Sequence, residues 1–527
     1  MMQQQVIILR DNVERTHGYE AQRSNISAAK ALAEAVRSTL GPRGMDKMLL
    51  DGTGDVTITN DGITILDEIS VQHPGAKMVI EVSRTQDEEV GDGTTTAVVL
   101  VGSLMEQAEI LLNKKIHPTV ICRGYRMGMT KAIEILNGMS TTVDPYNKDI
   151  LKKIVETAIT GKSIENVKEK ISDIAVEAVV AVAVKDGKKV VVSEDDVQIK
   201  THTGSTMDDA LLIRGIVIEK NRVNPAMPKK IKGAKVALVL SPLEIRKTEV
   251  KSKIKINDTH QLEAFAIQER DALKKMTDAV IASGANVLLC QKGIADSAQF
   301  FLAKAGVLAI EDVPEKDMKF AARALNATVA NKAEDLTKAM LGSAGGAEEI
   351  DDADMVKIFD AKNPKTVTIL LRGTTRYLVD ELERAMVDAT RVVMDTMEDG
   401  KYVPGGGAVE SEMIVRLREF ASTIGGREQI AIEAYADSFA AIPITLAENS
   451  GMNPIDKLVE LKSAHAAGKK MHGLNVYTGS MVDMIYEGVI EPLRCKRQAI
   501  QSSAEAVEML LRIDDMMVSK SHGPSMG

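Results

Sequence analysis

Apolar residues recur at intervals of three and four in five stretches of the chain, and this spacing places them on one face of an α-helix. The stretches are residues 25–40, 78–90, 94–112, 377–398 and 409–420. We predict a helix over each of them. The second and third helices are separated only by a short polar turn, so that turn lies between two helices rather than after a strand.

Other stretches are short and apolar, or alternate between apolar and polar residues, as β-strands do. Residues 56–59 and 63–66 alternate on either side of Asn60-Asp61-Gly62, which predicts a β-hairpin with Asp61 at its tip. Beyond about residue 213 there are four apolar runs, separated by amphipathic segments: 236–240, 287–289, 307–310 and 367–371. These runs predict a separate α/β domain.

A lysine-rich stretch and an amphipathic helix follow one another inside that domain. Residues 244–256 are rich in lysine, and Asp258 and Gln261 have the spacing of a capping box that opens a helix extending past Met276. Two interpretations are equally compatible with this pattern. The helix packs on its own domain, or it belongs to an exposed projection that offers its apolar edge to a partner.

Composition narrows the class of protein. At 527 residues the chain is too long for one core, and a prior of roughly 150 residues per domain suggests about three domains. A hydrophobic content of 44% and a charged content of 27% are typical of soluble globular proteins. The net charge of -9, 3% aromatic residues and absence of Trp argue against nucleic-acid binding, which needs positive charge and rings for stacking.

The apolar runs and the cysteines indicate in which cellular compartment the protein is found. The run at residues 6–9 is too short for a signal peptide, and the longest unbroken apolar run, 178–184, is far below the length of a membrane span. Cys122, Cys290 and Cys495 are odd in number and widely separated, which fits buried thiols better than disulfides or a zinc site. We therefore expect a soluble protein in the cytoplasm, without a membrane partner.

The polar turn Gly91-Asp92-Gly93-Thr94-Thr95-Thr96 carries the strongest candidate chemistry. Its glycines let main-chain N–H groups approach an anion, the threonines lie at the start of the next helix, and Asp92 is a hard oxygen ligand for Mg²⁺. The turn therefore suits a phosphate and its metal. An ordinary helix N-cap explains the same residues equally well when the turn is considered alone.

Other candidates are weaker. Glycine turns at Gly41-Pro42-Arg43-Gly44 and Gly405-Gly406-Gly407 allow close approach of a ligand, but the first is also a usual helix stop. Gly161-Lys162-Ser163 resembles the end of a P-loop, yet Glu156 stands where the first P-loop glycine belongs. Lys162 is then either a solvated lysine at a helix end or a group that reaches a terminal phosphate.

Asp388 lies on the long predicted helix at residues 377–398. It is two residues past Met386 of the apolar stripe, which turns it roughly 200° away from that stripe. It therefore faces solvent or a site, and Asp395 shares its face. Periodicity does not choose between the two carboxylates, and solvent is the default for both.

Several of these segments, in this order, resemble the group II chaperonins, the family of the archaeal thermosome and the eukaryotic cytosolic chaperonin. The resemblance covers nearly the whole chain. It is carried by residues 39–48 (TLGPRGMDKM), 60–62 (NDG), 91–96 (GDGTTT), 160–162 (TGK), 371–374 (LRGT), 405–407 (GGG), 425–429 (GGREQ) and 510–515 (LLRIDD). One such block would not be specific, but the ordered set is.

The resemblance implies a multidomain fold. A mainly α-helical equatorial domain (residues 1–146 and 403–527) would bind ATP. An α/β intermediate domain (147–215 and 368–402) would act as a hinge. An α/β apical domain (216–367) would bind clients, with a helical protrusion at about 244–276 that acts as a built-in lid.

The resemblance also implies roles for individual residues. Asp61 and Asp388 would position and polarise the attacking water, which selects Asp388 over Asp395. Asp92 would ligate Mg²⁺, and Lys162 would sense the terminal phosphate. The remaining contacts to ATP would come from Leu40, Gly41, Pro42, Gly93, Thr94, Thr95, Thr96, Gly406, Asn475 and Glu491.

The function implied is an ATP-hydrolysing chaperone that encloses unfolded proteins. Its partners would be non-native protein clients, identical or paralogous subunits in a double ring, and a prefoldin-type co-chaperone, with no separate lid protein. The chain departs from the family pattern at the acidic segment Glu311-Asp312-Val313-Pro314, at the lid turn Asn257-Asp258-Thr259, and in lacking a Gly/Met-rich tail. Two alternatives are a ring-forming holdase with little ATP turnover and a small-molecule kinase.

Overall fold

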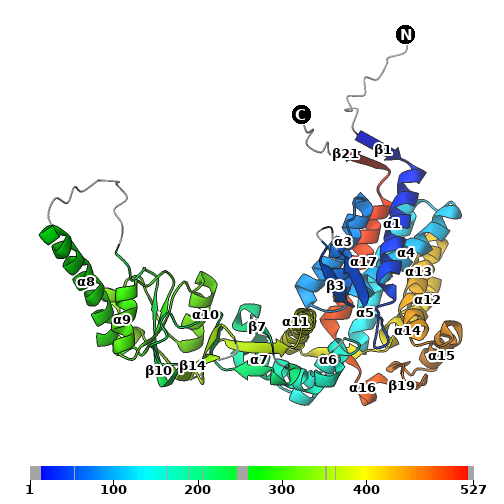
Figure 1. The fold of residues 1–527 in the computed structure, drawn as a ribbon. Coiled ribbons are helices and arrows are strands. Elements are labelled where there is room, and N and C mark those ends of the chain that lie inside the picture. Colours follow the sequence, from blue (N-terminus) through cyan, green and yellow to red (C-terminus); the bar gives the residue numbers. More distant parts are fainter. Residues whose placement is uncertain are drawn as a thin grey trace, which may run out of the picture. The chain divides into compact units, whose positions relative to one another are not determined.

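The computed structural model describes residues 13–50, 52, 54–162, 164–187, 189–204, 206–245, 259–350, 353–362 and 364–519. The chain divides into two compact units: unit 1 contains the chain up to Ser172 and again from Val387, and unit 2 contains Asp173–Met386. Two helices, α7 (Lys168–Val182) and α11 (Arg376–Asp399), pass from one unit into the other. The fold is therefore multidomain and mixed α/β (Figure 1).

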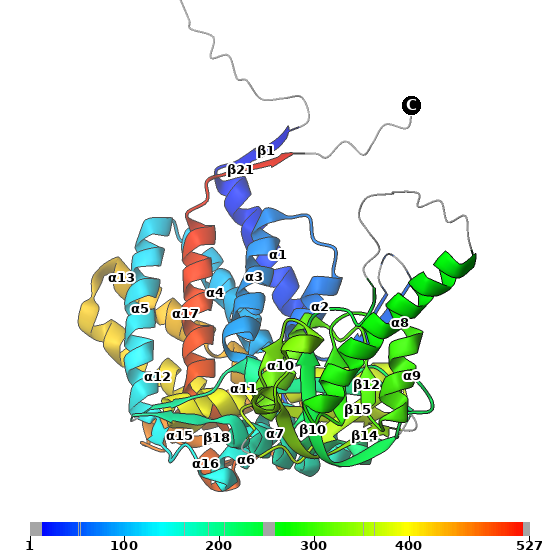
Figure 2. The same cartoon turned by 90° about the vertical axis from the view of Figure 1, so that its left-hand side faces the viewer.

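Unit 1 is mainly helical. Its longer helices are α1 (Tyr19–Arg37), α3 (Pro74–Val90), α4 (Thr94–Asn113), α5 (Pro118–Met139), α6 (Lys148–Ile159), α12 (Ala408–Ile424), α13 (Gly426–Ser438), α15 (Pro454–Ala466) and α17 (Leu493–Leu511). The shorter ones are α2 (Gly62–Glu68), α14 (Ala441–Asn449) and α16 (Met484–Glu487). Helices α1, α3, α4, α5 and α17 lie side by side (Figures 1 and 2).

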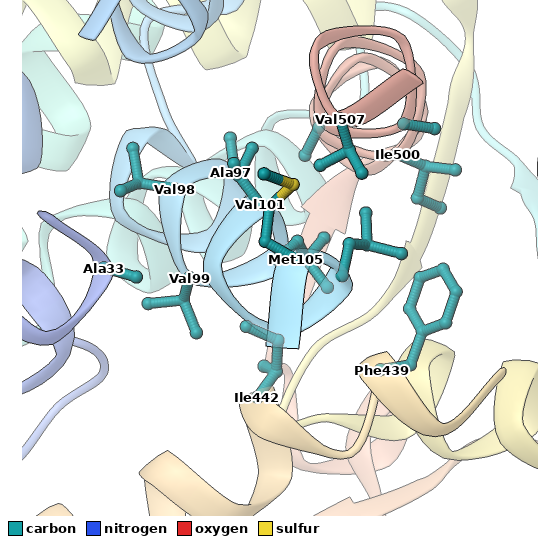
Figure 3. Close-up of a cluster of buried hydrophobic side chains, with 14 of the residues drawn as sticks. Ala33, Ala97, Val98, Val99, Val101, Met105, Phe439, Ile442, Ile500 and Val507 are labelled. Carbon is teal, nitrogen blue, oxygen red and sulfur yellow. The ribbon is translucent and has the colours of Figure 1, made fainter. Parts of the chain in front are cut away.

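Helix α4 forms the centre of this bundle because apolar residues cover most of its circumference. Figure 3 shows Val101 and Met105 of α4 among Val507 of α17 and Phe439, and Met105 is fully buried. Helix α1 packs closely on α4 because residue 102 is a glycine, where an added Cβ would stand 2.3 Å from Ala33 Cβ. The turn that precedes α4 is thereby fixed to a rigid core.

Small β-elements join distant parts of unit 1. The first and last described strands, β1 (Val13–His17) and β21 (Asp515–Ser519), pair antiparallel and bring the two chain ends together. Three further groups pair within the unit: β2 (Lys47–Leu50) with β3 (Val56–Thr59), β17 (Lys401–Pro404) with β4 (Thr141–Thr142) and β20 (Ile490–Pro492), and β18 (His472–Leu474) with β19 (Met481–Asp483). Strands β17 and β18 lead into the candidate site residues Gly406 and Asn475, and β20 contains Glu491.

Unit 2 contains a seven-stranded mixed sheet in the order β12-β11-β10-β14-β15-β9, with β13 pairing to β10. Its strands are β9 (Ile216–Ile218), β10 (Lys230–Val239), β11 (Val287–Cys290), β12 (Leu308–Ile310), β13 (Val329–Ala330), β14 (Gly342–Ile350) and β15 (Met355–Phe359). Its helices are α8 (Thr259–Ala282), α9 (Asp296–Lys304) and α10 (Glu315–Leu325). The acidic segment is built into this unit, because Glu311 Oε2 accepts a hydrogen bond from Ile294 N at 2.7 Å.

A second sheet in unit 2 has three strands. Strand β16 (Val367–Gly373) lies between β7 (Val197–Thr203), to which it is parallel, and β8 (Leu211–Ile213), to which it is antiparallel. A two-stranded ribbon of β5 (Val184–Asp186) and β6 (Lys189–Val191) completes the described strands of this unit. The predicted strand at residues 367–371 is therefore present, but it lies in a different sheet from the strands of the other three apolar runs. An apolar run identifies a buried strand but not its neighbours.

The predicted hairpin around Asp61 is wrong. Strand β3 is present, but it pairs with β2, and residues 63–66 lie in helix α2. Asp61 is the N-cap of that helix and accepts hydrogen bonds from Thr64 N (3.1 Å) and Thr64 Oγ1 (2.7 Å). Four alternating residues are too few to distinguish the period of a strand from that of a helix, and the N-cap formed by Asp61 favours the helix.

The five helices predicted from periodicity are confirmed as α1, α3, α4, α11 and α12. Helix α8 begins where the capping box predicts, although Asp258, the lysine-rich residues 246–256 and the C-terminal tail from 520 lie outside the described residues. Cys122, Cys290 and Cys495 are free and buried, as expected.

Two helical segments of the described chain are long and apolar enough to cross a membrane by length and composition alone. They are Thr94–Asn113 and Gly426–Asn449, and most of each is buried inside the protein. Helix α4 is the first of them, and core helices of soluble proteins pass the same test. Their apolar character is explained by the packing in Figure 3.

Candidate active site

The polar turn between α3 and α4 has a conformation that requires its glycines. Gly91 (φ 73°) ends α3 and Gly93 (φ 81°) precedes α4, both in the left-handed region. Within the described residues no side chain caps the first turn of α4, so the ordinary N-cap interpretation is not supported. Asp92 Oδ1 instead accepts from Gly93 N at 2.7 Å, and the free N–H groups at the start of α4 suit an anion.

This turn lines a cavity of about 110 Å³ that continues into one of about 350 Å³, both within unit 1. The smaller cavity is lined by Leu40, Gly41, Asp61, Asp92, Gly93, Thr94, Thr95, Thr96, Lys162 and Asp388 among others. The larger adds Pro42, Gly406, Asn475 and Glu491. Every residue to which the resemblance gives a role in the site therefore lines this continuous space.

The N-cap position of Asp61 directs it towards the turn. Gly62 lies against Thr95, where an added Cβ would stand 2.7 Å from Thr95 Oγ1, so α2 approaches the start of α4 closely. Thr94 Oγ1 lies 3.3 Å from Asp61 Oδ1 and donates to it. The carboxylate of Asp61 is thus held beside the threonines by both its own helix and α4.

Lys162 and Asp388 form a buried ion pair in the same cavity. Lys162 follows α6 through Gly161 (φ 88°), and its Nζ donates to Asp388 Oδ2. The two side chains are only 11% and 12% exposed. The interpretation of Lys162 as a solvated lysine at a helix end is therefore wrong.

The default expectation that Asp388 and Asp395 face solvent is wrong as well. Both are buried, because α11 packs on other elements around most of its circumference. Asp388 faces the cavity, whereas Asp395 lies away from it and accepts from Arg494 Nη1 at 2.7 Å. Structure thus separates two carboxylates that periodicity left equivalent.

The smaller cavity is lined by more carboxylates than ammonium groups. Burial raises the pKa of Asp388 to about 7 although the nearby ammonium of Lys162 opposes this, and burial also raises the pKa of Asp92. Burial alone would lower the pKa of Lys162, but the carboxylates of Asp388 and Asp61 raise it. A single lysine therefore faces three carboxylates, an arrangement that attracts a cation.

Mg²⁺ fits this donor set. Asp92 offers hard oxygen atoms, and Mg²⁺ commonly takes one or two carboxylates together with phosphate oxygens rather than a complete protein cage. Accordingly, the described part of the chain contains no group of three or more His, Cys, Asp or Glu side chains placed to hold a metal alone.

The larger cavity has apolar and polar walls. Gly41 (φ 82°) lies against Leu446, where an added Cβ would stand 2.4 Å from Leu446 Cδ2. Glu491, which also lines this cavity, is held by Lys496 Nζ at 3.0 Å, and the same ammonium donates to Glu410 at 2.8 Å. Such a space, apolar with a few fixed polar groups, suits a nucleoside.

Sequence reasoning missed several residues of the site. Leu446, Tyr477, Met484 and Lys496 line the larger cavity but carry no local pattern that marks them. Gln86 Nε2 donates to Asp92 O at 2.7 Å and supports the turn from inside α3. In the sequence, Gln86 could have been noticed only as a polar residue on the face of α3 that is buried.

Comparison with known proteins agrees with this geometry. The sequence profile of the TCP-1/cpn60 chaperonin family matches residues 32–521. The chain is similar to "Thermosome subunit beta" of Archaeoglobus fulgidus, with 51% identity over 98% of this chain and 95% of the relative. It is 50% identical to "Thermosome subunit alpha" of the same organism and 49% identical to "Thermosome subunit" of Methanopyrus kandleri, with the same coverage.

The profile and these relatives extend over the cavity and over both units. They agree with a site suited to a nucleotide and with the resemblance noted in the sequence. The chain therefore belongs to the TCP-1/cpn60 chaperonin family, as a cytoplasmic group II chaperonin subunit whose ATPase activity drives protein folding.

Proposed function

We propose that the continuous cavity of unit 1 binds Mg·ATP, and that Asp61 and Asp388 position the water that attacks its terminal phosphate. The observation that carries this proposal is the convergence of Asp61, Asp92, Lys162 and Asp388 on the uncapped start of α4. Phosphoryl transfer to water needs positioning and charge stabilisation more than covalent chemistry. Asp61 and Asp388 would supply the positioning, and Lys162, the N–H groups of α4 and a cation on Asp92 the charge stabilisation.

Each wall of the cavity has a distinct task in this proposal. Leu40, Gly41, Pro42, Gly406, Asn475 and Glu491 hold the nucleoside, while the N–H groups and hydroxyls from Gly93 to Thr96 hold the phosphates. Asp92 would hold Mg²⁺, which would supply charge neutralisation to the phosphate oxygens.

Lys162 and Asp388 would exchange partners during the reaction. In the structure Lys162 donates to Asp388, and the γ-phosphate would compete for the same ammonium. Transfer of Lys162 to the phosphate frees the Asp388 carboxylate to accept a hydrogen bond from water. Asp61, fixed as a helix cap, orients the same water from the other side.

We also propose the three-domain layout of the resemblance, with the equatorial domain at residues 1–146 and 403–527, the intermediate domain at 147–215 and 368–402, and the apical domain at 216–367. The seven-stranded sheet, which lies wholly within residues 216–359, supports the apical boundaries. Ile267 on α8, inside the lid segment 244–276, and Phe300 on α9 are each 59% exposed, and they support a client-binding surface that includes part of this segment.

The partners proposed are further subunits in a double ring, non-native clients and a prefoldin-type co-chaperone. Relatives named as alpha and beta subunits of one organism favour a ring with paralogous subunits. The β2–β3 hairpin supports subunit contact, because Met48 and Leu50 are 72% and 71% exposed on it.

Imaging of ring assembly tests the role of this hairpin. The double variant Met48→Asp, Leu50→Asp should give few rings by negative-stain microscopy, because buried unpaired carboxylates at an interface are costly. Ring formation at the wild-type level would exclude the hairpin as an essential contact. Tyr486→Asp, which changes another exposed residue of unit 1 (87% exposed), is the control.

Steady-state ATPase assays test the catalytic assignment. Asp388→Ala should lower kcat by about 10²–10⁴-fold with ATP still bound, since a positioned acid–base group contributes this much. Asp380→Ala, which removes a half-exposed carboxylate from the same helix, is the matched control. An active Asp388→Ala would refute the assignment, and an inactive wild type would favour the holdase alternative.

A further inference from the structure

Arg391 lies on α11 one turn beyond Asp388, and its side chain crosses the turn that carries Asp92. A Cβ added to Gly91 would stand 2.4 Å from Arg391 Cδ and 2.7 Å from Arg391 Cβ. The backbone of Gly91 and the stem of Arg391 are therefore in direct contact. This close approach, together with φ 73°, explains why residue 91 is a glycine.

The guanidinium of Arg391 fixes the end of α3. Its Nη1 donates to the Asp87 main-chain oxygen at 2.6 Å and lies 3.4 Å from the carboxylate of Asp87. The same main-chain oxygen accepts from Gly91 N at 2.8 Å, the bond that closes the last turn of α3. The Arg391 side chain is only 19% exposed, so this charged hydrogen bond is shielded from water.

We propose that Arg391 is a positioning residue for ATP hydrolysis, which holds Asp388 in register with Asp92. The inference rests on the proposed function, because it requires both carboxylates to act on one Mg·ATP. Asp388 and Asp92 come from segments almost three hundred positions apart in the chain, and Arg391 connects these segments directly. Displacement of a reacting group by about 1 Å costs on the order of 100-fold in rate.

The contact between Arg391 and the α3–α4 turn lies close to the point where α11 enters unit 1. This helix passes from unit 2 into unit 1 at Val387, so Arg391 attaches it to unit 1 within its first turn and a half there. Loss of the attachment would loosen the position of Asp388 while leaving the walls that hold the nucleoside intact. The expected consequence is a defect in turnover rather than in ATP binding.

A set of variants separates this role from a purely structural one. Arg391→Met keeps the apolar stem on Gly91 but removes the hydrogen bonds, and it should lower kcat about tenfold or more with KM for ATP within about twofold of wild type. Arg391→Lys should recover part of kcat, because one ammonium can still donate to the Asp87 oxygen. Asp87→Ala keeps that main-chain acceptor, so we expect kcat within about threefold of wild type.

Arg384→Met is the matched control, because Arg384 lies on the same helix and bonds to Glu381 within it. Rings counted by microscopy and circular dichroism establish that each variant is folded and assembled. Unchanged kcat in Arg391→Met, or equal loss in Arg391→Met and Arg384→Met, would overturn the inference. Asp388→Ala, measured in parallel, distinguishes the two claims. If Asp388→Ala stays active, the proposed function fails. If Asp388→Ala is inactive while Arg391→Met stays active, only the role of Arg391 fails.

Discussion

Ionisable side chains of the site are largely removed from solvent. Lys162 and Asp388 are both nearly buried, and the Glu491–Lys496–Glu410 cluster is another such group on the wall of the larger cavity. Buried charges rarely increase stability, so their presence in a cavity favours a functional reason. We infer that the chain keeps them for the nucleotide.

The residue types of the site could be predicted from the sequence, but their environments could not. Gly91, Gly93 and Asp92 indicated a phosphate turn because their chemistry is local. Burial of Asp388 depends on α6 and the α3–α4 turn, which are remote in sequence. Periodicity placed Asp395 on the same helix face as Asp388 and did not distinguish the two. The sequence also did not indicate that Asp395 would accept a hydrogen bond from Arg494, which is remote in the chain.

The raised pKa of Asp388 predicts how hydrolysis depends on pH. Burial raises this pKa to about 7, and the group must be ionised to accept a hydrogen bond from water. We therefore expect kcat/KM for Mg·ATP, which reports the free enzyme, to increase with pH through about 7 and then reach a plateau, with activity lost on the acidic side. The measurement is kcat/KM for Mg·ATP across this range.

Asp388→Asn provides the control for the pH profile. The amide cannot ionise, so the remaining slow hydrolysis should lose the ascending limb. A variant that keeps the same limb would assign the titration to another group and contradict the role of Asp388.

At the scale of elements, long periodic helices were predictable and short ones were not. Helices α3, α4 and α11 carry enough turns for the apolar stripe to be unambiguous. The α2 segment has seven residues, and its alternating Ile and Thr resemble a strand until Asp61 is seen to cap it. Similarly, β16 was predictable as a strand, but its sheet was not.

Helix α3 has an imidazole cap that predicts pH-dependent stability. His73 Nδ1 accepts from Gly75 N at 3.1 Å, while the opposite ring nitrogen lies 2.9 Å from Ser24 Oγ. The ring must be neutral to accept, and burial lowers the pKa of His73 below 6.5. The folded chain then binds fewer protons than the unfolded chain, so this stabilisation is complete above 6.5 and is lost as pH falls through the folded-state pKa.

Comparison with His73→Asn measures this effect. Asparagine retains a capping acceptor but does not titrate. On acidification from about pH 8 to about pH 5.5, the urea midpoint of the wild type should fall relative to that of His73→Asn. A difference that does not change with pH would exclude His73 as the cap that titrates.

At the scale of the whole molecule, the order of motif blocks allowed the family to be predicted, and the family is confirmed. The discontinuous composition of unit 1, with both chain ends in it, followed from that resemblance and not from local pattern. The pairing of β1 with β21 closes this unit across almost the full length of the sequence. No local signal in either strand identifies the other as its partner.

Lys162→Ala tests whether hydrolysis is coupled to lid closure. The variant should still bind ATP, because the turn at residues 91–96 and the nucleoside walls are unchanged. It should lose protection of residues 244–276 from protease in the presence of ATP, since the group that exchanges between Asp388 and phosphate is missing. Lys152→Ala, which alters a lysine of α6 outside the cavity, is the control, and full protection in Lys162→Ala would contradict the coupling.

The central claim is that Asp61, Asp92, Lys162 and Asp388 act on one Mg·ATP. The most direct measurement is a structure of the assembled protein with Mg²⁺, ADP and a fluoride mimic of the γ-phosphate. The account predicts Mg²⁺ on Asp92, Lys162 on the mimic, and the attacking water within hydrogen-bonding distance of both Asp61 and Asp388. A nucleotide bound with Asp388 remote from that water, and still paired with Lys162, would contradict it.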